Sequence, residues 1–249
     1  MALFIFEMPI ETVFLDAGGV LVWPNWNRVA EALNAHGVAA DARRFASADA
    51  TARFELDQAH VRSDQQGPRS FLELVLLEAG IEPSPAADAA LAEVRAYQRT
   101  ENLWEIVPDF VVPALRELRS APYKLVVVSN ANGTVHHLFD RLGLAPFFDA
   151  IIDSTVEGFE KPDRRLFEVA LARSGSRPET TVHAGDFYNV DVVGARGAGL
   201  TPVLVDECGL HADADCARIR TIAELPALLA SIGAPPSRRP ARRRPRRLS

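Results

Sequence analysis

Hydrophobic residues follow two kinds of pattern along this chain of 249 residues. In some segments they form short continuous runs, typical of buried strands, and in others they recur at every third or fourth position, typical of helices with one apolar face. The runs predict strands at residues 12–15, 124–128, 150–152, 181–184 and 202–205. The helical spacing predicts helices at residues 26–35, 41–59, 69–79, 86–99, 109–119, 134–142, 163–174, 190–198 and 222–232.

The order of these elements divides the chain into two parts. Residues 23–103 are predicted to contain helices alone, whereas helix and strand alternate from Pro108 onward. Short apolar strands that alternate with helices predict an α/β fold, a doubly wound parallel sheet covered by helices on both faces. We therefore expect a core domain made of residues 1–22 and 104–236, with residues 23–103 inserted as an all-helical cap domain.

Composition is consistent with a globular enzyme, since 48% of the residues are hydrophobic and 24% are charged. A chain of this length can bury a full core. Its longest apolar stretches, such as Leu125–Val128, have the length of strands, and the apolar start Met1–Phe6 lacks the basic flank and length of a signal peptide. Cys208 and Cys216 are too few for a disulfide framework. We expect a cytoplasmic protein without a membrane partner.

Charge is distributed unevenly, because residues 237–249 carry seven arginines and no acidic residue. Taking these arginines away from the net charge of −6 leaves −13 for residues 1–236. Such an acidic body does not attract nucleic acid, and a tail rich in Arg and Pro cannot bury enough apolar surface to fold. We expect a disordered tail, the one segment able to contact nucleic acid. No pattern predicts the oligomeric state.

Polar residues stand at the ends of several predicted strands. Asp16 follows the first strand and leads into a Gly18-Gly19 turn. The other polar residues of this kind follow later strands or precede a helix, and they are Ser129, Asn130, Lys161, Asp186 and Asp191. The carboxyl ends of parallel strands form one edge of a sheet, where such folds bind ligands. We therefore expect these side chains to converge on one crevice.

Two features of this set predict its chemistry. The carboxylates of Asp16, Asp186 and Asp191 would raise one another's pKa unless a cation neutralised them, and their hard oxygen atoms suit Mg²⁺. Lys161 is one of only two lysines among the 27 Lys and Arg residues. It precedes a predicted helix, where a positive charge opposes the helix dipole, so a local structural role does not explain it.

In this arrangement the chain resembles the haloacid dehalogenase superfamily. The superfamily pattern is a nucleophilic Asp in D-x-D-x-T, a Ser or Thr after the second strand, a Lys before a helix, and a final G-D-x-x-x-x-D. Asp16, Ser129, Lys161 and residues 185–191 match these motifs. The resemblance covers the whole chain except the tail, and the predicted insert is similar to the superfamily's helical cap of the first type.

The resemblance implies an enzyme that hydrolyses a small phosphorylated metabolite through an aspartyl-phosphate on Asp16. It implies that Mg²⁺ is held by oxygen ligands, namely Asp16, the Gly18 carbonyl and Asp186, with Asp191 supporting them. It further implies that the transferring phosphoryl group is bound and neutralised by Ser129, Asn130 and Lys161. The substrate itself is not predicted, because specificity comes from the cap, whose helices carry no motif.

Gly18 departs from the superfamily pattern. In the phosphatases of the superfamily, the second Asp of D-x-D protonates the leaving group and later activates water. Gly18 cannot do this, and losing such a group typically reduces the rate on the order of 10²- to 10⁴-fold. Either a cap residue or water replaces the acid, with Glu55, Asp57 and His60 as candidates, or the leaving group needs no proton, as in an acyl or aryl phosphate.

Two alternatives to a phosphatase remain. A 2-haloacid dehalogenase needs neither the second Asp nor a metal, and Arg43 or Arg44 would bind its substrate's carboxylate. A charged Asp186 argues against this alternative, because it would raise the pKa of Asp16 and weaken the nucleophile. The other alternative is a protein that binds a phosphorylated ligand without turnover, although binding alone needs no nucleophile. A phosphonoacetaldehyde hydrolase is excluded, because it requires a cap lysine and no lysine precedes Lys124.

Aromatic and histidine residues near these motifs are interpreted as structural. Trp23 and Trp26 stand where the chain would leave the core for the cap, and packing at this hinge is favoured over a place at the substrate entrance. His136, His137 and His183 are interpreted as structural or surface residues.

Overall fold

The computed structural model describes residues 9–59 and 70–232. The predicted tail at residues 237–249, the start Met1–Phe6 and the candidate acid His60 lie outside the described residues. Within the two described ranges, no helix combines the length and the apolar character needed to cross a membrane.

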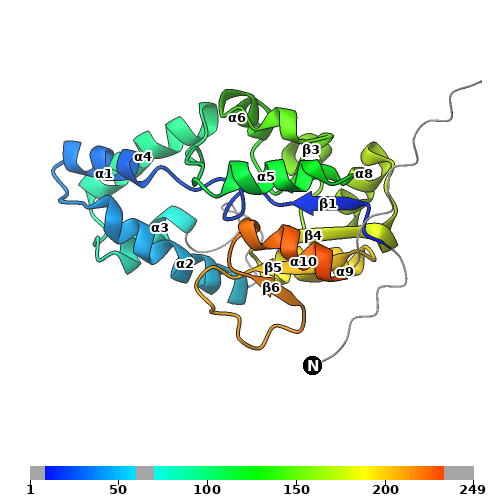
Figure 1. The fold of residues 1–249 in the computed structure, drawn as a ribbon. Coiled ribbons are helices and arrows are strands. Elements are labelled where there is room, and N and C mark those ends of the chain that lie inside the picture. Colours follow the sequence, from blue (N-terminus) through cyan, green and yellow to red (C-terminus); the bar gives the residue numbers. More distant parts are fainter. Residues whose placement is uncertain (1–8, 60–69, 233–249) are drawn as a thin grey trace, which may run out of the picture.

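A parallel sheet of six strands in the order β3-β2-β1-β4-β5-β6 forms the centre of the fold (Figure 1). The strands are β1 (Thr12–Leu15), β2 (Lys124–Ser129), β3 (Ala150–Asp153), β4 (Thr181–Gly185), β5 (Thr201–Val205) and β6 (Ala217–Ile219). Leu15 of β1 is in register with Val127 on one side and Ala184 on the other. The strand order reverses at β1, and open α/β sheets bind their ligands at such a switch point.

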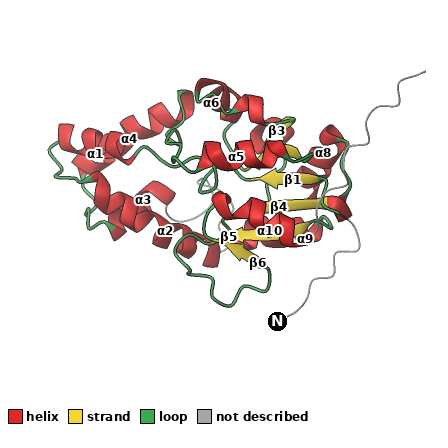
Figure 2. Cartoon of the chain, viewed as in Figure 1, coloured by secondary structure: helices red, strands yellow, loops and turns green. Residues whose placement is uncertain are grey.

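Helices cover both faces of this sheet (Figure 2). They are α5 (Val111–Ser120), α6 (Val135–Arg141), α7 (Ser154–Glu157), α8 (Arg164–Ser174), α9 (Val193–Gly197) and α10 (Leu225–Ile232). Side chains alternate along a strand, so Val13 joins one buried cluster with Leu115 of α5 and Phe14 joins another with Phe167 of α8. The predicted fold class, a doubly wound α/β sheet, is confirmed.

Between β1 and α5 the described chain is helical. The helices are α1 (Trp26–Ala35), α2 (Ala42–Gln58), α3 (Phe71–Glu78) and α4 (Pro85–Thr100), and we call residues 26–100 the helical insert. They pack around a buried cluster of their own, which includes Val29, Phe45 and Val75. The insert lies beyond the carboxyl end of β1 (Figure 1). The exact division into two domains stays a prediction.

Three elements differ from the pattern expected from the sequence. The short helix α7 (Ser154–Glu157) was not predicted, because four residues are too few to show a helical repeat. The predicted helix at residues 190–198 starts as a π-helical turn, η3 (Tyr188–Val192), before it continues as α9. The strand β6 was not predicted, because its three residues, Ala217–Ile219, are too few for a recognisable run. None of these differences moves the carboxyl ends of β1, β2 and β4, where most of the predicted site residues stand.

Candidate active site

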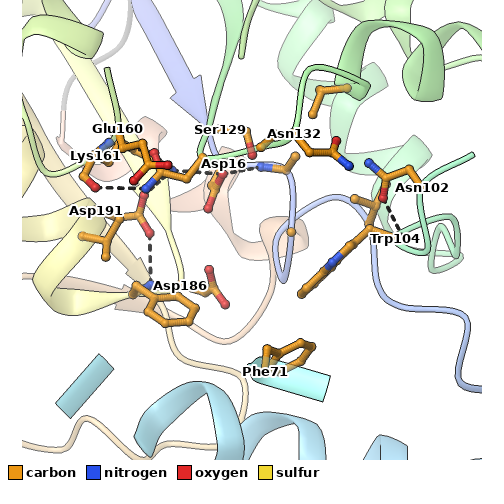
Figure 3. Close-up of a pocket in the computed structure, with 18 of the residues that line it drawn as sticks. Asp16, Phe71, Asn102, Trp104, Ser129, Asn132, Glu160, Lys161, Asp186 and Asp191 are labelled. Carbon is orange, nitrogen blue, oxygen red and sulfur yellow. Dashed lines mark hydrogen bonds and ion pairs between the residues drawn. The ribbon is translucent and has the colours of Figure 1, made fainter. Parts of the chain in front are cut away.

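A cavity of about 240 Å³ lies where the carboxyl end of the sheet meets the helical insert. The structure brings every predicted site residue to its wall, namely Asp16, Gly18, Ser129, Asn130, Lys161, Asp186 and Asp191. Figure 3 shows the labelled side chains of this wall around Asp16. The roles assigned to these residues stay predictions, but their position in one cavity is what the strand ends indicated.

Lys161 is fully buried and carries its ammonium between two carboxylates. Its Nζ lies 3.0 Å from Asp16 Oδ1 and 2.7 Å from Asp191 Oδ1. Burial opposes the charged ammonium, but the two carboxylates raise the pKa of Lys161 above its ordinary value. Burial raises the pKa of Asp16, while the Lys161 charge lowers it. The ammonium therefore orients Asp16 and favours its ionised form.

Asp191 holds the Lys161 ammonium in place and is itself held by further hydrogen bonds. Besides Lys161, its Oδ1 accepts a hydrogen bond from His183 Nε2 at 2.8 Å, and its Oδ2 accepts one from the Phe187 backbone N–H at 3.1 Å. Burial would raise the pKa of Asp191, but Lys161 and His183 hold it well below its ordinary value. His183 is structural, as interpreted, yet it contacts a predicted supporting residue of the metal site. Its place inside an apolar strand gave no signal of this contact.

Asp186 is paired with an arginine of the helical insert. Arg53 of α2 places its Nη1 2.8 Å from Asp186 Oδ2 and its Nε 2.7 Å from Asp49 Oδ1. Burial opposes the charged guanidinium, but the two carboxylates raise the pKa of Arg53. Gly19 permits this approach, because a Cβ there would lie 2.1 Å from Arg53 Nη1 and its φ is +69°. A residue of the insert thus supplies a counter-charge inside the core.

The carboxylates of the site form a compact acidic cluster. Three carboxylate oxygens, one each from Asp16, Asp186 and Asp191, all lie within 4.8 Å of one another. The pKa of Asp186 is raised to about 8. Burial is the main cause, the Arg53 charge lowers the value, and the carboxylates of Asp16 and Asp191 raise it further. Hard oxygen donors at this spacing fit a divalent cation, whose charge relieves their repulsion. The residues present therefore fit the predicted ion, which would share Asp186 with Arg53.

Ser129, the last residue of β2, and Asn130, which follows it, contact different parts of the site. Ser129 is buried and lines the cavity. Asn130 bonds the Lys161 backbone twice, since its Oδ1 accepts from the Lys161 N–H at 2.7 Å and its Nδ2 donates to the Lys161 carbonyl at 2.9 Å. Asn130 therefore positions the segment that carries Lys161. Its predicted contact with a phosphoryl group stays a prediction.

The helical insert also holds the loop that carries Asp191. The buried Asp57 of α2 accepts hydrogen bonds from the backbone N–H groups of Tyr188 at 2.9 Å and Asn189 at 2.8 Å. Burial raises the pKa of Asp57, while these N–H groups lower it. They are the first N–H groups of η3, which has no side-chain cap of its own. Asp57, a candidate replacement acid from the sequence, instead caps η3 from another part of the fold.

Trp104 covers the position of the absent second carboxylate. A Cβ on Gly18 would lie 3.1 Å from Trp104 Cζ3 and 3.2 Å from its Cε3. The indole stacks on Phe71 of α3, with ring centroids 5.5 Å apart and planes at 23°. The Trp104 backbone N–H donates to Asn102 Oδ1 at 2.9 Å, which fixes the chain on which the ring is carried. The space beside Gly18 is therefore occupied by the Trp104 ring.

Arg53 and Trp104 were not identified as site residues from the sequence, and Asp57 was considered as a replacement acid and not as a helix cap. Asp49, Arg53 and Asp57 are spaced by four on one predicted helix, so a charged stripe was visible. Such stripes ordinarily face solvent, and nothing local indicated that this one faces the core. For Trp104 the sequence carries no signal, because its partner Phe71 is distant along the chain.

Other candidates lie away from the cavity. Arg43 and Arg44, considered as ligands for a substrate carboxylate, are exposed, as is the candidate acid Glu55. None of the three is among the described residues that line the cavity. Trp23 packs edge-on against a core aromatic ring, with centroids 5.8 Å apart, and Trp26 is buried in the insert. Packing near the hinge, the favoured interpretation of both tryptophans, agrees with these positions.

Sequence comparison matches residues 10–199 to a protein-family model described as haloacid dehalogenase-like hydrolase. A glyceraldehyde 3-phosphate phosphatase of Methanothermobacter thermautotrophicus is 40% identical over 104 residues, which cover 41% of this chain and 45% of that protein. The chain thus spans about half the length of the curated relatives that it matches.

Comparison with solved structures finds the same fold. The HAD-hydrolase YfnB of Bacillus subtilis, solved with bound magnesium, superposes with a TM-score of 0.65 at 19% identity, over 89% of this chain and 99% of that one. A 2-haloacid dehalogenase of Pseudomonas syringae superposes with a TM-score of 0.56 at 23% identity, over 89% and 99%. At these identities the structural likeness concerns the fold alone.

Proposed function

Because the chain belongs to the haloacid dehalogenase-like hydrolase family, we propose that it is a Mg²⁺-dependent phosphatase of a small phosphorylated metabolite. The observation that carries this proposal is the position of Asp16. Its carboxylate lies in the cavity wall, 3.0 Å from a buried ammonium and within the cluster of carboxylates that fits a divalent cation. The phosphatase relatives support phosphoryl transfer as the chemistry.

In the first step, an oxygen of Asp16 attacks the phosphorus atom and forms an aspartyl-phosphate. The bond from phosphorus to the leaving oxygen breaks, and its electron pair departs with the leaving group. Lys161, held between Asp16 and Asp191, supplies positive charge beside the transferring group. The buried Ser129 hydroxyl offers a hydrogen bond to a phosphoryl oxygen from the end of the neighbouring strand β2.

Mg²⁺, when bound, would neutralise the phosphate oxygens and the carboxylates, so that two anions can approach each other. The residues that would hold it are Asp16, the Gly18 carbonyl and Asp186. Asp191 would support them, and its Oδ1 is already bonded to Lys161 and His183.

In the second step, water attacks the phosphorus atom of the aspartyl-phosphate and the bond to Asp16 breaks. The products are inorganic phosphate and the original carboxylate, and the water protons pass to phosphate and solvent. Gly18 offers no base to this water, so we expect the second step to be slow relative to the first. The loss of a positioned base typically reduces a rate by about 10²- to 10⁴-fold.

A phosphate-release assay with and without chelator tests the proposal. We expect the wild-type protein to release phosphate from at least one small ester or acyl phosphate in Mg²⁺, and to stop when the metal is chelated. Asp16→Asn should lose this activity, whereas Asp140→Asn, an exposed carboxylate of α6, should keep it. Unchanged release by Asp16→Asn contradicts the proposal.

One observation favours a second candidate, a metal-independent 2-haloacid dehalogenase. The charge of Asp186, which argued against this activity, is offset by Arg53 at 2.8 Å without any metal. In that reaction Asp16 attacks carbon and halide leaves without needing a proton, so Gly18 is no obstacle. Halide release from a short 2-haloacid in the presence of chelator, with no phosphate release in Mg²⁺, is the result that selects this candidate.

A further inference from the structure

An aromatic ring fills the position of the absent carboxylate. Trp104 Cζ3 lies 3.1 Å from where a Cβ on Gly18 would stand, which is tighter than ordinary van der Waals contact. Gly18 is not among the glycines with positive φ, so the ring restricts this position and the backbone conformation does not. The stack on Phe71 supports the indole, and the hydrogen bond from the Trp104 backbone N–H to Asn102 fixes the chain that carries it. Trp104 is therefore a supported wall beside the nucleophile.

The described part of the chain places no replacement acid beside this wall. Glu55 is exposed, and Asp57 is occupied by the backbone N–H groups of η3. Glu160 does line the cavity, but it lies on the Lys161 side of the nucleophile, away from the indole (Figure 3). A leaving group that rests against the wall therefore meets no acid among these residues.

Apart from Glu160, the three carboxylates of the acidic cluster and their cationic partners Lys161 and Arg53, the described lining is uncharged. Its apolar side chains include Leu56, Phe71, Trp104 and Phe187, and its uncharged polar side chains include Gln98, Asn102, Asn132 and Thr155. The Arg53 guanidinium is already paired with Asp49 and Asp186, so a second anionic group on a substrate competes with them. A volume of about 240 Å³ is below the roughly 300–1,000 Å³ of drug-sized sites. The cavity suits one small, flat, uncharged group.

We propose that the substrates are aryl phosphate monoesters and that Trp104 is the residue that selects them. This inference rests on the proposed phosphatase function and names its substrate class. The phenol ring stacks on the indole, and the phosphate reaches Asp16 from that side. Gly18 is small because the indole needs the space, not because an acid has been lost.

The chemistry of the leaving group agrees with this assignment. A phenol has a pKa of about 10, as the tyrosine side chain does, whereas the pKa of water is about 15.7. A phenolate therefore departs with its electron pair without receiving a proton in the transition state, while an alkoxide of water-like basicity needs an acid. Water then cleaves the aspartyl-phosphate, and the overall products are the phenol and inorganic phosphate.

The wild-type protein tests the inference through the dependence of rate on the leaving group. In Mg²⁺ we expect kcat/KM to fall from nitrophenyl phosphate through phenyl phosphate to glycerol phosphate, by at least the roughly 10²- to 10⁴-fold that a positioned acid supplies. For the fast aryl esters kcat should be the same, because they share the slow hydrolysis of the aspartyl-phosphate. Equal kcat/KM for glycerol phosphate and phenyl phosphate overturns the inference but leaves the proposed phosphatase intact.

Binding measurements test the role of the indole separately from turnover. Calorimetry should show that Trp104→Leu binds phenylphosphonate about 3- to 10-fold more weakly, the value of one aromatic contact. Methylphosphonate should bind the variant and the wild type equally. Trp23→Leu is the matched control, because Trp23 packs against Phe110 outside the described lining. If Trp104→Leu loses affinity equally for both phosphonates, or loses affinity for neither, selection by Trp104 is contradicted.

Two further outcomes distinguish a failure of the aryl phosphate assignment from a failure of the proposed phosphatase function. If no phosphate is released from nitrophenyl phosphate, glycerol phosphate or acetyl phosphate, the phosphatase function itself fails. If Glu160→Gln steepens the dependence on the leaving group, Glu160 is the acid and the inference fails alone. In the double variant Gly18→Asp/Trp104→Ala, where a carboxylate gains room, we expect the preference for aryl over alkyl esters to shrink.

Discussion

The Lys161 ammonium is enclosed by carboxylates on two sides and has no exposed surface. An ion in such a place is tolerated only while its partners remain, because an uncompensated buried charge is strongly unfavourable. Lys161 therefore contributes to stability as well as to the proposed chemistry. A compact ammonium suits this place between two carboxylates better than the larger planar guanidinium, which agrees with a lysine here in a chain that has 25 arginines and only two lysines.

Lys161→Met tests this reasoning. Removal of the ammonium leaves Asp16 and Asp191 buried with less compensation, and we expect the free energy of unfolding to fall by about 3–5 kcal/mol. Denaturant unfolding measures this change. Lys124→Met is the matched control, because Lys124 is exposed and donates to the carbonyls of Ser174 and Gly175 at the end of α8. That variant should lose less than about 1 kcal/mol. Similar losses of unfolding free energy in both variants would contradict the stabilising role of Lys161.

Single residues differ in how well the sequence predicts them. Asp16, Lys161 and Asp186 stand at strand ends or in motifs, so their meeting in one cavity followed from the topology. Arg53 reaches the cavity from the insert and Trp104 from the segment that follows it, and their partners Asp186 and Phe71 are far along the chain. Such contacts depend on how the insert docks, which no local pattern contains.

Among the elements, α2 connects the helical insert to the candidate site. Asp49, Arg53 and Asp57 lie on successive turns and are buried. Arg53 pairs with Asp186, and Asp57 caps the first turn of η3, which carries Asp191. The position of both core carboxylates is therefore coupled to the position of one helix of the insert.

Asp57→Ala should weaken metal binding without removing a ligand. The first N–H groups of η3 lose their acceptors, so the loop with Asp191 is held less firmly. Loss of such a supporting residue typically reduces metal affinity by about 10- to 100-fold. Calorimetric titration with Mg²⁺ measures the change, with Glu55→Ala, exposed on the same helix, as the control. Unchanged Mg²⁺ affinity in Asp57→Ala refutes the coupling.

The segments that join the insert to the core meet at Glu105. Its carboxylate accepts hydrogen bonds from Asn25 Nδ2 at 2.9 Å and Tyr97 Oη at 2.8 Å, and it pairs with Arg28 and Arg141. Burial would raise the pKa of Glu105, but these hydrogen bonds and the two arginines hold it below its ordinary value. Folding therefore favours the ionised form of this carboxylate.

This shift predicts a pH-dependent contribution to stability. Because the pKa is lower in the folded state, the stabilisation is fully present above the unfolded pKa of about 4.3 and is lost as the pH falls through the folded pKa. We expect Glu105→Gln to lower the free energy of unfolding by about 1–2 kcal/mol at pH 7. Thermal unfolding from pH 7 down to acid should show the two proteins converging. A difference that stays constant in acid, or appears equally in exposed Glu101→Gln, argues against this role.

Elements were predicted well where their pattern is long. Helix α1 was predicted with its observed bounds, Trp26–Ala35, and most core strands within one residue. The π-helical start of the helix after β4 was not predicted. Its first two N–H groups, those of Tyr188 and Asn189, donate to Asp57 of the distant helix α2 and not to a side chain of the preceding residue.

At the scale of the whole molecule, the core sheet and the insert make different contributions. Strand ends of the sheet supply the carboxylates and the ammonium, while the insert and its return segment supply a counter-charge, a helix cap and an aromatic wall. The alternation of helix and strand predicted this architecture. It did not predict which side chains of the insert and its return segment enter the cavity, and we propose that one of these, Trp104, selects the substrate.

Direct detection of the aspartyl-phosphate tests whether Asp16 accepts a phosphoryl group. The protein is mixed with nitrophenyl phosphate and Mg²⁺, quenched in acid within the first turnovers, and its peptides are examined by mass spectrometry. Because Gly18 offers no base to the attacking water, the intermediate should accumulate. We predict a burst of nitrophenol equal to the enzyme concentration and one phosphoryl group on the Asp16 peptide, both absent in Asp16→Asn. Phosphate release without a phosphoryl group on Asp16, or with one on another residue, would contradict this prediction.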